Sequence, residues 1–142
     1  MRVRNRFEDS RFEPVRFGAE EMAQVANEAS RVMHERIGRG ETVEGRPATP
    51  LSPGYARYKS RRGLPAIRDW TLTGETLAQL RVVEVSPGSA TVAFDGASNK
   101  LLRLARWNAE RDQMIGLSEA DQQQVLNVQE SLYAEMHQRR GR

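Results

Sequence analysis

The sequence contains no cysteine, and this absence excludes several classes of chemistry at once. Without thiols the chain has no disulfide framework, no cysteine nucleophile and no cysteine-ligated zinc site. Its two histidines, His34 and His137, lie near opposite ends of the chain and lack the spacing of metal ligands. We therefore expect no metal site and no cofactor.

Long apolar runs are also missing from the sequence. A membrane-spanning helix needs about 20 consecutive apolar residues, and no segment approaches that length. The N-terminal segment is rich in arginine but has no apolar stretch of the kind that a secretory signal requires. The chain is therefore expected to fold in a cytoplasm, without membrane contact, and its 142 residues suit a single domain.

Catalytic motifs are absent from the sequence as well. Its glycines form neither a GxGxxG pattern nor a phosphate-binding loop, and its serines lack a GxSxG setting. The adjacent carboxylates Glu20 and Glu21 would diverge by about 100° on a helix and could not share a substrate. We expect that the protein is not an enzyme.

Lysine is scarce in this chain whereas arginine is abundant. Lys59 and Lys100 are the only lysines among 22 basic residues, and the net charge is +3. Guanidinium groups pair with phosphates and with carboxylates, so this composition suits contact with DNA or with an acidic protein surface. A GC-rich coding sequence explains the same bias without any function, and 19 interspersed acidic residues keep the excess charge small.

Apolar periodicity predicts two long helices. Residues 18–38 have one apolar stripe at spacings of three and four, and the segment after Ser118 has a second stripe. Ser118 is the expected N-cap of the last helix, and Asp121 is placed so that its carboxylate can reach back to the cap. His34 falls off the first stripe and is predicted to face solvent.

Two strands are predicted between these helices. Residues 81–86 and 89–95 flank Pro87-Gly88, which is a compact hairpin signal. The side chains expected to be buried in this hairpin are Val83, Val85, Val92 and Phe94. Shorter helices are predicted at 53–62 with Ser52 as N-cap, at 74–80 with Thr73 as N-cap, and at 100–111.

The predicted fold is therefore α+β. A small antiparallel sheet with a β-hairpin core packs against a long N-terminal helix and a C-terminal helix within a single domain, residues 17–137. Residues 1–16 alternate arginine with apolar or small residues, which favours an extended arm that either pairs with a neighbouring subunit's sheet edge or is disordered. Residues 39–50 are predicted to be a flexible loop that orders against a partner, and residues 138–142 a basic tail.

Aromatic and basic side chains are combined in the predicted helix 53–62. Tyr55 and Tyr58 are three residues apart and share a face. Aromatic rings beside basic groups can stack nucleic-acid bases, but tyrosines in this pattern are more often core anchors with the charged side in solvent.

A second basic ridge is predicted on the helix 100–111. Trp107 lies beside it and either packs on the domain or anchors an interface. The candidate interface or phosphate contacts of the whole chain are Arg2, Arg4, Arg6, Arg57, Lys59, Arg61, Arg62, Lys100, Arg103, Arg106 and Trp107.

Two stretches of the sequence resemble a known family. Residues 51–83 contain a Tyr-x-x-Tyr-Lys segment and a Leu-Thr-Gly turn before a strand pair, and residues 114–121 contain a Gly-Leu-Ser-x-x-Asp helix start. Over roughly residues 50–135 the chain resembles the small virion morphogenesis proteins that complete the neck or tail of tailed phages. The resemblance is carried by Tyr55, Tyr58, Lys59, Leu72, Thr73, Gly74, Gly116, Leu117, Ser118 and Asp121. Many relatives have an aromatic residue before the Gly-Leu-Ser, where this chain has Met114 and Ile115.

This resemblance implies a structural virion protein whose copies form a six- or twelve-fold ring between the head connector and the tail, assembled in the bacterial host cytoplasm. Its partners would be copies of itself and other head-tail connector and tail proteins, with non-specific contact to passing DNA. Two alternatives stay open. One is a small basic nucleic-acid-binding module, and the other is a free-standing partner-binding domain, such as a regulator acquired from a prophage.

Overall fold

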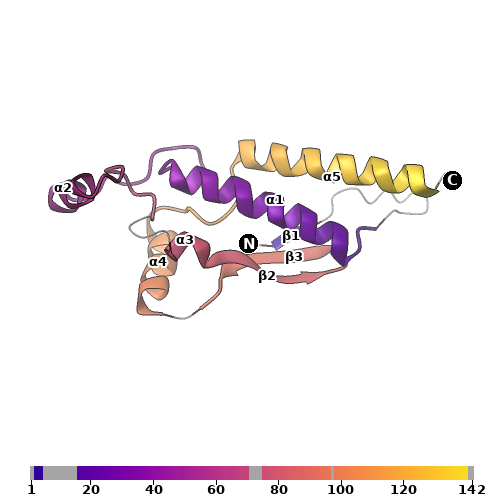
Figure 1. Cartoon of the computed structure of the whole chain (residues 1–142), viewed down its shortest axis with the longest axis horizontal. Coiled ribbons are helices and arrows are strands. Elements are labelled where there is room, and N and C mark those ends of the chain that lie inside the picture. Colours follow the sequence, from indigo (N-terminus) through magenta and orange to yellow (C-terminus); the bar gives the residue numbers. More distant parts are fainter. Residues whose placement is uncertain (1, 5–15, 71–74, 97, 141–142) are drawn as a thin grey trace.

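The computed structural model describes residues 2–4, 16–70, 75–96 and 98–140 and confirms the predicted α+β class (Figure 1). The elements follow one another as β1 (Arg2–Arg4), α1 (Ala19–Gly38), α2 (Pro53–Arg61), α3 (Glu75–Ala78), β2 (Leu80–Ser86), β3 (Ser89–Phe94), α4 (Asn99–Glu110) and α5 (Glu119–Arg140). Leu72, Thr73 and Gly74 lie outside the described residues, and with them the predicted cap of α3.

The core forms between three layers. An antiparallel sheet of order β1-β3-β2 is covered on one face by α1, and α5 lies along the other side of α1 (Figure 1). The apolar stripe of α1 includes Met22, Val25, Ala29 and Met33, all fully buried. Because α1 is packed between the sheet and α5, most of the core consists of its contacts to these two layers.

The first strand belongs to the domain itself. Residues Arg2–Arg4 pair with β3 in antiparallel register, from Arg2 opposite Thr91 to Arg4 opposite Ser89. Val3 is buried in the core. The prediction that this part of the arm pairs with a neighbouring subunit, or is disordered, is therefore wrong, because the side chain of Val3 gains a place in the core of its own chain. Residues 5–15 of the predicted arm lie outside the described residues.

The hairpin forms at the predicted turn, but its buried side chains differ from those expected. Val92 is fully buried, whereas Val83 and Val85 are 45% and 36% exposed. The register shifts between Val82 and Glu84, so the bulge leaves Val83 unpaired and Val82 opposite Val92 packs on the core. Because β2 is an edge strand with a bulge, a simple alternation of buried and exposed side chains fails here.

The loop 39–50 is ordered by its own chain. The backbone N–H of Thr42 donates to the carbonyl of Arg46 at 2.8 Å, and the N–H of Val43 donates to the carbonyl of Gln113 at 2.9 Å. Ala48 is buried in the second core cluster. These contacts overturn the prediction that the loop orders only against a partner. His34 also differs from expectation, since it is partly buried and its Nε2 donates to the carbonyl of Leu80.

The start of α5 is fixed by a reciprocal cap and a buried ion pair. The N–H of Asp121 donates to Ser118 Oγ, and the N–H of Ser118 donates to Asp121 Oδ2, both at 3.1 Å, as predicted. Arg36, 1% exposed, donates from Nε to the same Asp121 oxygen at 2.8 Å. Its other nitrogens donate to the carbonyl oxygens of Glu41, Met114 and Gly116. One guanidinium thus joins the end of α1 to the start of α5.

Gly116 of the Gly-Leu-Ser motif is expected to be intolerant of a side chain. Its φ is 144°, and a Cβ atom would lie 3.1 Å from Val43 Cγ1. Gly116→Ala should therefore lower the free energy of unfolding by about 1–3 kcal/mol, measured by urea titration. Gly54→Ala, in α2 with open space around the added carbon, is the matched control. A neutral Gly116→Ala would contradict a conformational role for this glycine.

Candidate docking surface

Helix α2 projects from one end of the molecule (Figure 1). Its N-terminus is capped as predicted, because Ser52 Oγ accepts from the N–H of Tyr55. Tyr55 and Tyr58 are 41% and 43% exposed and stack with ring centroids 6.1 Å apart. The guanidinium of Arg62 lies 4.7 Å from the Tyr58 ring centroid. The expectation that these tyrosines are core anchors is therefore wrong.

The side of α2 that faces inward is occupied by Lys59, which is only 2% exposed. Its Nζ donates to Asp69 Oδ1 at 2.6 Å and to the carbonyl of Ile67 at 2.7 Å. A buried ammonium needs such partners because leaving water is costly. Lys59 therefore holds α2 against the segment 62–70, and its prediction as a phosphate contact is wrong.

The basic ridge on α4 is exposed. Lys100, Arg103 and Arg106 all lie on its solvent side, where Arg106 is paired loosely with Glu110 at 4.0 Å. A hollow of about 530 Å³ is lined by Asn99, Leu102, Arg103 and Arg106. Leu102 is 57% exposed, so an apolar side chain is presented among the cations.

Trp107 packs on the domain and is half-buried. Its Nε1 donates to Asp112 Oδ2 at 2.9 Å, and the guanidinium carbons of Arg68 and Arg111 lie 4.1 and 4.9 Å from its ring centroid. Asp112 also accepts from the backbone N–H and the hydroxyl of Thr49 at 3.1 Å. Trp107 thus belongs to a polar cluster that joins the end of α4 to residues 49 and 68.

Asp112 should make the stability of this cluster dependent on pH. Burial opposes its ionisation, but the hydrogen bonds from Trp107 and Thr49 outweigh burial and lower the pKa of its carboxyl below the ordinary 3.8. Because the folded pKa is the lower one, the contribution is complete above pH 3.8 and is lost as the pH falls through the folded value. The difference in unfolding free energy between wild type and Asp112→Asn should shrink in urea titrations from pH 6 toward pH 3. A difference that is unchanged across this range would contradict the assignment.

Trp70 lies in a strained and buried position next to α2. It has a φ of 58°, the only positive value of a non-glycine residue within the described part of the chain. Trp70 is 9% exposed, and its buried Nε1 has no hydrogen-bond partner among the described residues. A pocket of about 170 Å³ is lined by this residue, by Tyr55 and Lys59 of α2, and by Lys100 and Leu104 of α4. The pocket therefore lies where α2, the segment 67–70 and α4 meet.

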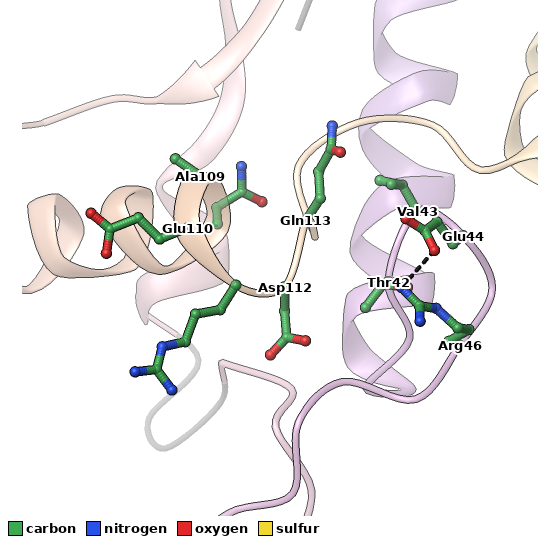
Figure 2. A pocket seen from close by; sticks show the side chains of 10 residues that line it. Thr42, Val43, Glu44, Arg46, Ala109, Glu110, Asp112 and Gln113 are labelled. Carbon is green, nitrogen blue, oxygen red and sulfur yellow. Dashed lines mark ion pairs between the residues drawn. The ribbon is translucent and has the colours of Figure 1, made fainter.

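A second hollow, shown in Figure 2, separates the loop 42–46 from the end of α4. It has a volume of about 410 Å³ and is lined on one side by Thr42, Val43, Glu44 and Arg46, with Glu44 and Arg46 forming an ion pair at 2.6 Å. Residues 108–113 form the other side. Carboxylates and guanidinium groups are mixed on its walls, so it has no marked preference for ligand charge.

Charge is distributed unevenly along the molecule. The end formed by α2, the segment 62–70 and α4 is called here the basic end. Residues 51–70 and 99–111 hold nine of the 22 Lys and Arg residues but only two of the 19 acidic residues. The remainder of the chain therefore has 13 basic and 17 acidic residues. The net charge of +3 is therefore the sum of a strongly basic end and an acidic remainder.

The predicted site residues are thus only partly brought together. Those of α2 and α4 lie at the basic end, whereas Arg2 and Arg4 lie in β1 and Arg6 lies outside the described residues. No family model, curated protein or solved structure matches the chain. None of the described helices has the length and apolar composition to cross a membrane, and the described residues contain no cluster of three metal-ligating side chains.

Sequence reasoning missed the residues that organise the basic end. No sequence pattern singles out Asp69, Trp70 or Asp112. The proximity of Asp69 to Lys59, ten positions away on a segment that turns back after Gly63, was the one available signal. Nothing in the local pattern around Trp70 indicates its positive φ.

Proposed function

We propose that this chain is a structural virion protein of a tailed bacteriophage, forming an oligomeric ring in the neck or tail-completion region that joins the head connector to the tail. The observation that carries the proposal is the exposed group of Tyr55, Tyr58 and Arg62 on the projecting helix α2. Tyrosine and arginine are enriched among the residues that dominate the energy of protein interfaces. The motif resemblance of residues 51–83 and 114–121 supplies the virion context.

The mechanism is subunit docking without chemistry. The buried pair of Lys59 and Asp69 fixes α2 in one orientation, so its aromatic face is presented to a partner without a large ordering cost. A ring needs a heterologous contact in which one face of a subunit meets a different face of the next. A basic end and an acidic remainder on the same subunit suit this kind of contact.

Electron microscopy of assembled particles tests the proposal. A ring of density between connector and tail should fit the three-layer fold with α2 at a subunit or partner contact. Complementation with the double variant Tyr55→Ala and Tyr58→Ala should yield heads without tails, whereas Gln123→Ala, an exposed change on α5, should assemble normally. A finished particle that lacks this chain would refute the assignment.

The second candidate is a small nucleic-acid-binding module, which is favoured by the concentration of nine Lys and Arg residues in ranges that meet at one end. Titration of duplex DNA at increasing salt separates the two functions. A nucleic-acid module should bind below micromolar concentration at physiological salt, with affinity falling steeply as salt is raised. Weak binding of duplex DNA under those conditions would favour the assembly role.

A further inference from the structure

We propose that the pocket at Trp70 is a docking site for an acidic protein segment. One apolar side chain of the segment fills the pocket. Neighbouring carboxylates of the segment pair with the cations of the basic end. This inference concerns the partner's chemistry and stands whether or not the partner is a virion component.

The backbone of Trp70 supports this inference. A φ of 58° is rare for a bulky side chain and costs about 1–3 kcal/mol. Such strain persists only where the surrounding structure holds the residue in place, and it is concentrated at binding sites. Trp70 is held by the second core cluster, in which its ring packs 5.8 Å from that of Phe94.

The size of the pocket limits what it can hold. Its volume of about 170 Å³ is well below the range of about 300–1,000 Å³ that is usual for small-molecule and cofactor sites. It suits a single side chain of a partner instead. Leu51, Tyr55, Ile67 and Leu104 contribute apolar lining, so that side chain should be apolar.

The charge around the pocket selects an acidic partner. Lys59 is already paired with Asp69, but Lys100 is exposed at the pocket on α4. Arg68 also lines the pocket, and Arg57 and Arg61 are exposed on α2 at the same end of the molecule. Cations beside an apolar pocket fit an acidic peptide more closely than a nucleic acid, because the pocket lies between helices and Trp70 is buried, out of position to stack on a base.

The test begins with a displayed library of random 12-residue peptides, selected on the immobilised full chain. Enriched peptides should share an apolar residue flanked by Asp or Glu. Synthetic copies are then titrated into ¹⁵N-labelled protein, whose two tryptophans give two indole signals. The signal of Trp70, identified with Trp70→Phe, should move on binding, and that of Trp107 should move much less.

Two matched charge reversals on α4 locate the contact. Lys100→Glu should weaken peptide binding by about tenfold or more, because it places like charge beside the bound segment. Arg106→Glu is the same kind of change on the same exposed helix, does not line this pocket, and should weaken it by less than about threefold.

Three results would overturn the inference. One is a selection that enriches no acidic-apolar pattern. Another is a titration in which only the Trp107 signal moves. The third is a 12-base-pair duplex DNA whose binding moves the Trp70 signal and is weakened equally by Lys100→Glu and Arg106→Glu. That result would assign the surface to nucleic acid. If Trp70→Phe fails to fold, Trp107→Phe assigns the same two indole signals, so the readout on wild-type protein remains decisive.

Discussion

Arg36→Met should lower the free energy of unfolding by about 3–5 kcal/mol, the largest effect expected from a single substitution in this chain. The change removes the cation that pairs with Asp121, which is itself buried, and leaves the carbonyl oxygens of Glu41, Met114 and Gly116 without their donor. The Asp121 carboxylate then keeps the hydrogen bond from the Ser118 N–H but has no counter-ion, and a buried charge without one is costly. Urea unfolding at neutral pH measures the loss.

The matched control for this substitution is Arg39→Met, one turn later in the sequence. Arg39 is exposed and contacts Glu41 at 3.4 Å, so its removal should change stability by less than about 1 kcal/mol. The double variant Arg36→Met and Asp121→Asn should recover part of the loss, because no unpaired charge then remains buried. Equal effects of Arg36→Met and Arg39→Met would refute the role of the buried guanidinium.

Asp69→Ala should release α2 while the three-layer core stays folded. The substitution leaves the Lys59 ammonium buried beside one carbonyl, and detaching α2 returns it to water. Breaking a buried ion pair costs about 3 kcal/mol or more, so amide exchange in α2 should accelerate about 100-fold. Exchange in α1 should change little, since its buried face contacts the sheet and α5.

Two further variants test the expected release of α2. Arg61→Ala alters an exposed charge on the same helix and should leave exchange in α2 within about threefold of wild type. Lys59→Met combined with Asp69→Leu replaces both charges with apolar groups and should restore most of the protection. Acceleration throughout the whole chain in Asp69→Ala would mean that the pair stabilises the core and not the placement of α2.

The long helices and the hairpin were predictable because local pattern and burial agree there. The stripe of α1 needs only spacings of three and four to predict its buried face, and the caps at Ser52 and Ser118 depend on residues within one turn. The Pro87-Gly88 turn is equally local. These elements could be predicted because the residues that determine them are close together in the sequence.

The errors have a different origin. Arg36 and Asp121 are 85 positions apart, and nothing in a helical pattern distinguishes an arginine at a helix end from one in the core. Lys59 was grouped with its basic neighbours, although the helix turns it toward Asp69 while Tyr55 and Tyr58 face outward. In β2 a single bulged residue, Val83, shifts the alternation. Each error concerns a long-range partner or one residue's change of register.

The pairing of β1 with β3 has a consequence for synthesis on the ribosome. The hairpin of β2 and β3 closes across two residues, whereas Arg2 must meet Thr91. The first strand therefore waits for almost ninety residues to emerge before its place exists, and contacts so distant in sequence form late. During that interval β1 has no partner strand and stays accessible to chaperones.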